Sequence, residues 1–338
     1  ALFHFTELLE KHPGHYGALY KLINLLKRAG KLSDAPRFLR LAERHSPRAE
    51  HDAGLKFCKG VYHRYNAEDH EAIKMLNQVR LSGDWGLMAT EHMIEIYLSP
   101  ERPTLWSETA ASEASEAPAD NAEACRVAEK LLRDIAPSLR TTRHQVYEAY
   151  VLIVSMNRTN VEQGIQHLGA VLSENSSDVR ALLALATALM VLRQMPKARN
   201  QLKRIAKMPY NSELADQFVQ AYLLLADVYI GTGKYDLAQD YLQKALSYDK
   251  SCAKAWEYMG LIMEKEAAYK DAAENYEQAF LLQNEASASV GFKLAFNFLK
   301  AERFVEAIDV AHKVLALYPD YPRIRKEILL RARESLRR

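Results

Sequence analysis

Cysteine is scarce in this chain, with only Cys58, Cys125 and Cys252 among 338 residues. They are far apart and odd in number, which argues against a disulfide framework and favours reduced thiols in an intracellular protein. No apolar run approaches the roughly 20 residues that a membrane-spanning helix needs, so no transmembrane segment is expected. No signal peptide is recognisable either.

Glycine and proline are also few, with 13 and 11 residues, and strand-like stretches are rare. This favours an all-α protein. The formal net charge is only +2, which is too small by itself to indicate a nucleic-acid-binding protein. A chain of 338 residues is long for one compact core but ordinary for a stack of repeats.

The stretch 219–286 contains the same pattern of bulky and small residues twice, about 34 residues apart. The residues Tyr222, Leu225, Ala226, Tyr229, Ala238, Leu242 and Ala245 correspond to Trp256, Met259, Gly260, Met263, Ala272, Tyr276 and Ala279. This pattern is the signature of the tetratricopeptide repeat (TPR), a helical hairpin that cannot bury its apolar face alone. The sequence therefore predicts a right-handed α-solenoid of about eight hairpins with a capping helix at the C-terminal end.

Small residues at repeat-like intervals mark where the second helix of each hairpin should approach the first. With Gly260 in a first helix, the predicted packing residues are Ala35, Ala72, Gly164, Ala198, Ala238, Ala272 and Ala307, and Ala124 marks one further hairpin. A mostly large residue follows four positions later, and a residue of the next apolar row follows three positions after that. Together these positions form one apolar face of an amphipathic helix.

The spacing of the small residues divides the chain into three repeat-containing parts and two segments that depart from the repeat pattern. Residues 1–15 are the second helix of a truncated repeat, so we expect further repeats upstream. Residues 16–98 hold repeats and the first helix of an interrupted repeat, and residues 122–321 hold the remaining repeats. The units are expected near 16–49, 53–86, 87–137, 145–178, 179–212, 219–252, 253–286 and 288–321.

Two segments depart from the repeat pattern. Residues 99–121 are rich in Ala, Ser, Glu and Pro and are predicted to be an acidic, disordered insert, either tolerated between two helices or used for docking around Leu105, Trp106 and Ser107. Residues 322–338 are predicted to be a basic cap helix whose apolar stripe is Ile324, Ile328, Leu329 and Leu336.

Motifs that carry chemistry are weak. Gly231-Thr-Gly-Lys234 lacks the full phosphate-loop spacing and a preceding strand, so it is interpreted as the turn inside one hairpin. The histidines and cysteines form no recognisable metal or nucleophile arrangement. We therefore expect no enzymatic activity, no cofactor and no metal site. Of the places that a carboxylate-clamp TPR domain fills with Lys and Asn, only Asn24 fits, so such a clamp is rejected.

Two basic features are candidate partner-binding surfaces. Arg199, Lys203 and Lys207 recur every four residues along one predicted helix, and Arg323, Arg325 and Lys326 begin the predicted cap helix. Each set is either a solvated face or a contact for an acidic partner or an anionic membrane surface. Aromatic residues do not interleave with the first set, which weakens an RNA-binding interpretation.

Several segments are more specific than the repeat consensus. They are HYGALYKLINLLKRAGKLSDAPRFL (15–39), CKGVYHRY (58–65), ARNQLKRIAKM (198–208), SCAKAWEYMGLIMEKEAAYKDAAENYE (251–277), VGFKLAFNFLKAERFVEAID (290–309) and YPRIRKEIL (321–329). In these segments the chain resembles the C-terminal region of the large TPR-only subunit of intraflagellar transport complex A, which is the tetratricopeptide repeat protein 21 family. The resemblance covers nearly the whole chain except residues 99–121.

The resemblance implies a non-enzymatic scaffold in retrograde ciliary transport and ciliary membrane-protein trafficking. It implies partners among the other complex A subunits, of WD40 and TPR type. Complex B trains or an anionic membrane surface are further candidate partners, and no nucleic-acid partner is expected. The implied location is the cilium or flagellum and its base, in the cytoplasm and associated with the cytoskeleton. The alternatives are a free-standing TPR peptide receptor unconnected with cilia and an RNA-binding protein.

Overall fold

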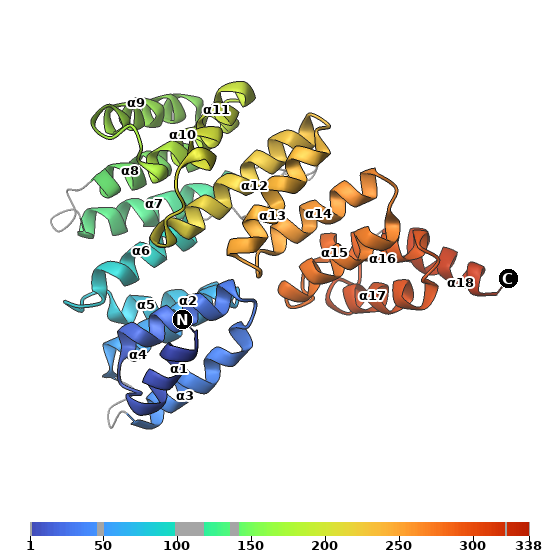
Figure 1. The fold of residues 1–338 in the computed structure, drawn as a ribbon, viewed down its shortest axis with the longest axis horizontal. Coiled ribbons are helices and arrows are strands. Elements are labelled where there is room, and N and C mark those ends of the chain that lie inside the picture. Colours follow the sequence, from blue (N-terminus) through green and yellow to red (C-terminus); the bar gives the residue numbers. More distant parts are fainter. Residues whose placement is uncertain (1, 46–50, 99–117, 136–141, 322, 338) are drawn as a thin grey trace. The chain divides into compact units, whose positions relative to one another are not determined.

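The computed structural model describes residues 2–45, 51–98, 118–135, 142–321 and 323–337, and within these ranges it contains helices and no strand (Figure 1). The chain separates into two compact units, Ala1–Pro209 and Tyr210–Arg338, each treated by itself below. The all-α repeat fold predicted from the spacing of small and large residues is confirmed.

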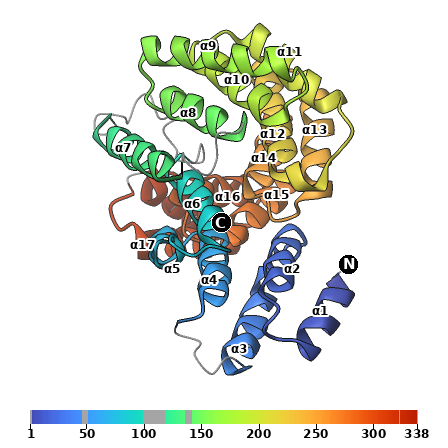
Figure 2. The same cartoon turned by 90° about the vertical axis from the view of Figure 1, so that its left-hand side faces the viewer.

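Unit 1 is built from consecutive helical hairpins. Its helices are α1 (Leu2–Lys11), α2 (Tyr16–Arg28), α3 (Ala35–His45), α4 (Ala53–Tyr65), α5 (Asp69–Val79), α6 (Gly86–Tyr97), α7 (Pro118–Ile135), α8 (Thr142–Val154), α9 (Arg158–Glu174), α10 (Val179–Val191) and α11 (Met195–Lys207), with a short 3-10 helix at Leu32–Asp34. Each even-numbered helix pairs with the helix that follows it, and α3, α5, α7 and α9 also contact the next even-numbered helix (Figure 2).

Unit 2 repeats the same arrangement. It contains a short 3-10 helix at Ser212–Leu214, then α12 (Ala215–Gly231), α13 (Tyr235–Tyr248), α14 (Ala253–Lys265), α15 (Tyr269–Leu282), α16 (Ala288–Lys300), α17 (Phe304–Leu317), a π-helix η5 (Ile324–Leu329) and α18 (Leu330–Leu336). The hairpins are α12/α13, α14/α15 and α16/α17, and each second helix also packs on the element after it.

Small residues lie where paired helices come closest. All the predicted packing positions are buried, the alanines among them completely: Ala35, Ala72, Gly164, Ala198, Ala238, Gly260, Ala272 and Ala307. The backbone oxygen of Ala149 would lie 3.1 Å from a Cβ added at Gly164. A long side chain at these places would therefore force the two helices apart.

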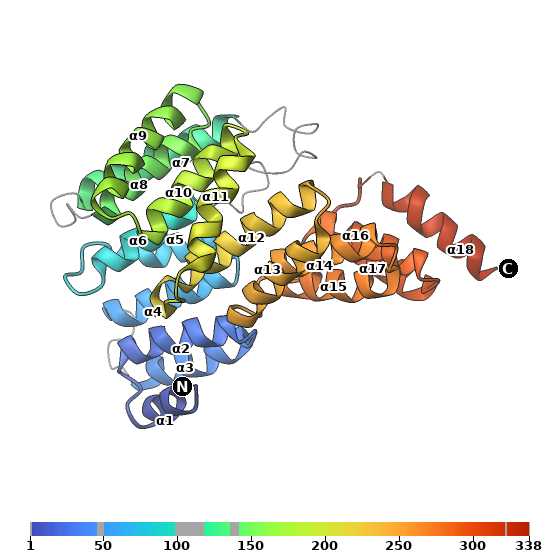
Figure 3. The ribbon, with the colours of Figure 1, turned by 45° about the horizontal axis from the view of Figure 1, so that its top comes forward.

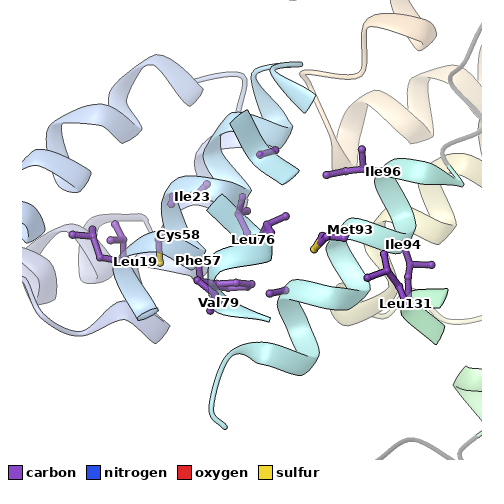
Figure 4. Packing of buried hydrophobic residues seen from close by; sticks show 14 of the residues in the cluster. Leu19, Ile23, Phe57, Cys58, Leu76, Val79, Met93, Ile94, Ile96 and Leu131 are labelled. Carbon is purple, nitrogen blue, oxygen red and sulfur yellow. The ribbon is translucent and has the colours of Figure 1, made fainter. Parts of the chain in front are cut away.

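The core of unit 1 passes from one hairpin to the next. Figure 4 shows Leu19 and Ile23 of α2, Phe57 and Cys58 of α4, Leu76 and Val79 of α5, and Met93 and Ile94 of α6 as successive parts of one buried cluster. The predicted apolar row that contains Leu76 and Val79 is buried in this cluster. Since no hairpin encloses its own core, each depends on its neighbours for burial.

The hairpin turns that the structure describes share one backbone feature, a residue in the left-handed region. These residues are Gly30, Ala67, Met156, Arg193, Gly233, Ala267 and Glu302, with φ between 54° and 71°. Only two are glycine, which adopts this conformation without the cost that other residues bear. The segment Gly231–Lys234 is one of these turns, so its interpretation as a turn rather than a phosphate loop is confirmed.

Two boundaries differ from the sequence predictions. The predicted insert 99–121 lies outside the described residues as far as residue 117, but α7 already begins at Pro118. Proline is tolerated in the first turn of a helix because no hydrogen bond is lost there. The predicted cap helix 322–338 contains the π-helix η5 before α18, at the end of unit 2 (Figure 3).

The apolar stripe predicted for this last segment was wrong at one residue. Ile324, Ile328 and Leu329 are buried as predicted, but Leu336 is 52% exposed and Ala332 is buried in its place. The reason is that Leu336 ends α18, where no described residue of unit 2 covers it, whereas Ala332 lies one turn nearer the buried residues of η5.

Candidate partner-binding surfaces

The basic stripe of α11, formed by Arg199, Lys203 and Lys207, is partly buried and partly exposed. Ala198, Leu202 and Ile205 bury one face of the helix, which leaves Arg199, Lys203 and Lys207 on another. Lys207 is exposed, whereas Arg199 and Lys203 are half-buried. The Nε atom of Arg199 is buried and has no hydrogen-bond partner among the described residues. The stripe is therefore only partly available to a partner.

A fourth cation beside this stripe is held within unit 1. The guanidinium of Arg204 donates to the Ser176 carbonyl at 2.7 Å and to Gln201 Oε1 at 2.9 Å. These bonds connect α11 to the turn before α10. Arg204 thus serves packing between neighbouring hairpins, and Lys207 is the member of the stripe that is most accessible.

The cations that begin the C-terminal segment are exposed. Arg323 precedes η5, and Arg325 and Lys326 lie within it. Arg325 donates to the Pro319 carbonyl at 3.2 Å, which leaves most of its guanidinium donors available. Ile324 and Ile328 fix the opposite face of η5 in the core.

A third polar group, which sequence patterns did not reveal, joins the first helices of three hairpins in unit 1. We call it the polar seam: Arg64 of α4, Glu91, His92 and Glu95 of α6, and Arg143 and Tyr147 of α8.

Glu95 is the centre of the polar seam. Its carboxylate pairs with Arg64 at 2.8 Å and accepts a hydrogen bond from the Tyr147 hydroxyl at 2.9 Å. Arg64 also contacts His92, and Arg143 pairs with Glu91 at 2.9 Å. Because these residues come from α4, α6 and α8, their bonds fix how successive hairpins are aligned.

Burial and neighbouring charges shift the pKa of Glu95, the centre of the polar seam, in opposite directions. Burial alone would raise the pKa of Glu95, but the charges of Arg64 and His92 and the hydrogen bonds from Arg64 and Tyr147 lower it to about 2. Burial, followed by the Arg64 charge, lowers the pKa of His92 to about 4. Glu95 is therefore ionised and His92 neutral near pH 7.

For Glu91 the effect of burial on the pKa outweighs that of the neighbouring charges. Burial raises the pKa of its carboxyl to about 7, although Arg143 and, to a lesser extent, Arg180 favour the ionised form. Its Oε1 atom, the Nε atoms of Arg143 and Arg180, and Nδ1 of His144 are buried and lack a hydrogen-bond partner among the described residues. This end of the polar seam is less fully satisfied than the end around Glu95.

The rejected carboxylate clamp can also be judged from the contacts of its one matching residue. Asn24 Oδ1 accepts a hydrogen bond from the Tyr65 hydroxyl at 2.6 Å. In unit 2, Glu257 occupies the clamp position that Tyr20 holds in unit 1, and it pairs with Lys254 and Lys293, each at 2.8 Å. Burial raises the pKa of Glu257, but the two lysines more than offset this and lower it. Asn24 and Glu257 thus each have partners within their own unit.

The thiols lie in packing positions. Cys58 and Cys125 are buried, and Cys252 is half-buried. Burial, with a smaller contribution from Asp52, raises the pKa of the Cys58 thiol, which makes it a poor nucleophile. Within the described ranges no three His, Cys, Asp or Glu side chains are grouped as metal ligands would be. None of the described helices is long and apolar enough to span a membrane.

Comparison with known proteins identifies relatives along nearly the whole chain. Residues 127–333 match the family model described as the tetratricopeptide repeat protein 21 C-terminal ARM domain, and residues 1–98 match the TT21 fifth ARM repeats domain. Human tetratricopeptide repeat protein 21B is 45% identical over 94% of this chain and 25% of the relative. Mouse tetratricopeptide repeat protein 21A is 41% identical over 98% and 26%.

The chain thus spans about a quarter of the length of the curated relatives it matches. Among solved structures, the hetero-tetramer Cut9-Hcn1 of the APC/C has a TM-score of 0.56 at 12% identity, covering 94% of this chain and 57% of that one, which shows the fold alone. A repeat array of this kind supports a role in holding other proteins. From the two family models, which together cover most of its length, we conclude that the chain belongs to the tetratricopeptide repeat protein 21 family.

Proposed function

We propose that this chain is a non-enzymatic scaffold segment of a subunit of intraflagellar transport complex A. In this role it binds other subunits of the complex, of WD40 and TPR type, and acts in retrograde ciliary transport and in the delivery of membrane proteins to cilia. Its place of action is the cilium or flagellum and its base. The observation that carries the proposal is the match of both parts of the chain to family models.

The physical basis of the proposal is the extent of the surface. A stack of hairpins presents many rigidly held side chains, and a stable protein interface buries about 1,200–2,000 Å². The polar seam aligns α4, α6 and α8, so the surface of unit 1 is prepared before a partner arrives. A pre-organised surface loses less conformational entropy on binding than a flexible one does.

The basic stripe is the proposed contact for an acidic partner. Lys207 is exposed, and Lys197 at the start of α11 is exposed as well. Rim charges of this kind mainly raise the association rate and make binding sensitive to salt. The same cations would attract complex B trains or an anionic membrane surface, with assembly experiments deciding between these partners.

The test is cross-linking of the native complex, followed by mass spectrometry, with the cross-links assigned to the residues of this chain. We expect lysines of α11 to cross-link to other complex A subunits. In parallel, the complex is reconstituted with Lys197→Glu and Lys207→Glu, and with Lys31→Glu as a matched control, because Lys31 is also exposed but lies far away on the chain.

Cross-links to complex A subunits and weaker assembly of the double variant alone would support the proposal. It is wrong if the purified complex A subunits neither cross-link to the chain nor co-purify with it at low salt. Binding of isolated short peptides, but of no folded subunit, would instead favour a free-standing peptide receptor.

A further inference from the structure

A groove runs between α17 and the segment formed by η5 and α18. Its volume is about 560 Å³. His312 and Leu315 of α17 line one side, and Arg325, Leu329, Leu330 and Arg333 line the other. Arg325, Leu329 and Arg333 are spaced four residues apart in the sequence, and all three line this side of the groove.

The floor of the groove is apolar and accessible. The side chain of Leu330 is 54% exposed, and Leu315 is only partly buried. Leu329 beside them is buried. An apolar surface of this kind gains free energy when another apolar surface covers it.

The rim of the groove is cationic. Among the described residues, no carboxylate lies within ion-pair distance of Arg325 or Arg333, and the guanidinium of Arg325 is bonded only to the Pro319 carbonyl. His312 is exposed on the opposite side. The occupant that complements this rim carries carboxylates beside its apolar residues.

A helix placed in the groove would continue the packing order of unit 2. In unit 2, each first helix is covered by a second one, as α14 is by α15 and α16 is by α17. The segment of η5 and α18 packs on α17 as a first helix does, and no helix among the described residues covers it in the same way. A π-helix at this point is a second unusual feature, since such segments frequently mark functional sites.

We propose that this groove binds an acidic amphipathic helix from a partner protein. The apolar stripe of that helix packs on Leu315, Leu329 and Leu330, while its flanking Asp or Glu residues pair with Arg325 and Arg333. This mode of recognition uses apolar anchors at i, i+3 and i+4. The proposal rests on the proposed scaffold function and names the chemistry of one of its partners.

The experiment selects ligands for the full chain from a displayed library of amphipathic helices about five turns long. Their apolar stripe is fixed, and the flanking positions are varied among acidic, neutral and basic residues. We expect enrichment of Asp and Glu at the flanks. A selected peptide should bind at least about tenfold more weakly to Arg325→Glu/Arg333→Glu and to Leu330→Glu.

The matched control is Lys326→Glu, which changes an exposed cation of the same segment that does not line the groove. It should alter peptide affinity by less than about twofold. Circular dichroism of each variant separates lost binding from lost folding, and Arg333→Gln, a milder change, should give an intermediate affinity.

Three results would overturn the proposal: no enrichment from the library, enrichment of neutral or basic flanks, or equal effects of Lys326→Glu and Arg325→Glu/Arg333→Glu. Binding of vesicles that contain anionic lipid, with loss of that binding in all three cation variants alike, would assign the segment to a membrane surface instead. Because complex assembly is measured separately, a failed groove leaves the scaffold function intact.

Discussion

Gly260 of α14 faces the ring of Tyr276 across the α14/α15 hairpin, so that a Cβ added at Gly260 would lie 3.0 Å from the nearest ring carbons. Tyr276 cannot withdraw easily, because its ring is fully buried and its hydroxyl bonds to Glu264 at 3.1 Å. The absence of a side chain at one residue thus creates the space that a large residue of the next helix occupies.

We therefore expect Gly260→Leu to open this hairpin and to lower the free energy of unfolding by about 2–4 kcal/mol. Ala272→Arg should have a similar effect, because Ala272 is fully buried and an unpaired guanidinium there would be desolvated. Chemical denaturation followed by circular dichroism measures both. Gly231→Ala is the control, since nothing lies within 4 Å of its added Cβ. Unchanged unfolding of both large variants would contradict the assigned packing.

A second prediction concerns the left-handed residues of the hairpin turns. Ala267 has a φ of 60°, which costs an alanine more than a glycine. Ala267→Gly should therefore raise the free energy of unfolding by about 0.5–1 kcal/mol, whereas Gly233→Ala should lower it by about 1 kcal/mol.

The neighbouring residue Ala268, whose φ is −83°, provides the control for this pair. Ala268→Gly adds flexibility without relieving strain and should be destabilising. The comparison uses urea unfolding midpoints at constant slope. If both glycine substitutions shift the midpoint in the same direction, backbone strain is not what distinguishes the two positions.

The polar seam predicts an acid-sensitive unit 1. The folded-state pKa of His92 is about 4, below the ordinary value of 6.5. The stability due to its neutral form is therefore present above about pH 6.5 and is lost as the pH falls towards 4. His92→Gln cannot take up a proton, so it should remove about 2 kcal/mol of the stability loss in that window.

Glu95 acts in a lower window. Its pKa of about 2 lies below the ordinary 4.5, so its contribution is present above about pH 4.5 and is lost as the pH falls towards 2. This second loss should persist in His92→Gln and be reduced in Glu95→Gln. Hydrogen exchange of α4 and α6 at a series of pH values measures both. The exposed residue His4 provides the control His4→Gln. An unaltered pH profile in His92→Gln would refute the assignment.

The basic stripe gives a prediction about assembly. Reversing Arg199, Lys203 and Lys207 to Glu should weaken binding to an acidic partner by about tenfold at low salt and by less at high salt. The half-buried position of Arg199 adds a cost in stability of about 1–2 kcal/mol for its reversal. Lys207→Glu alone should weaken assembly without changing the melting temperature, measured by differential scanning calorimetry. Equal salt resistance of the variant and original complexes would mean that the stripe is only solvated.

The repeat architecture was predictable because its signal is local. Small residues such as Ala72 and Ala272 must stand at closest approach, and large ones such as Leu76 and Tyr276 follow one turn later. These requirements recur with each hairpin, so a single sequence carries several copies of the same evidence. The chain could therefore be divided into hairpins without knowledge of contacts between distant residues.

The polar seam could not be predicted in the same way. Arg64, Glu95 and Tyr147 belong to three different hairpins, and nothing in the sequence says which charged residue of one faces which of the next. A glutamate on a largely apolar helix, as with Glu91 and Glu95 of α6, is the one available signal. It indicates that a partner exists but does not identify it.

The π-helix was missed for a different reason. The stripe of Ile324, Ile328 and Leu329 fits an ordinary amphipathic helix. A π-helical turn is wider than an α-helical turn, so it changes the side of the helix on which the later residues lie, but the residues before it give no sign of this change. Leu330 is consequently turned into the groove. Leu336 was expected to be buried but is exposed, because it lies at the end of α18, where no described residue of unit 2 covers it.

The polar seam also has a mechanical consequence. If α4, α6 and α8 slid past one another by one turn, Arg64 and Glu95 would be separated while still partly buried, and each charge would lose its partner. Apolar contacts alone resist such shear weakly, since one leucine can replace another as a neighbour. A pulling force applied along unit 1 would therefore meet a discrete barrier at each of these junctions, and the hairpins would yield by abrupt steps rather than by gradual creep.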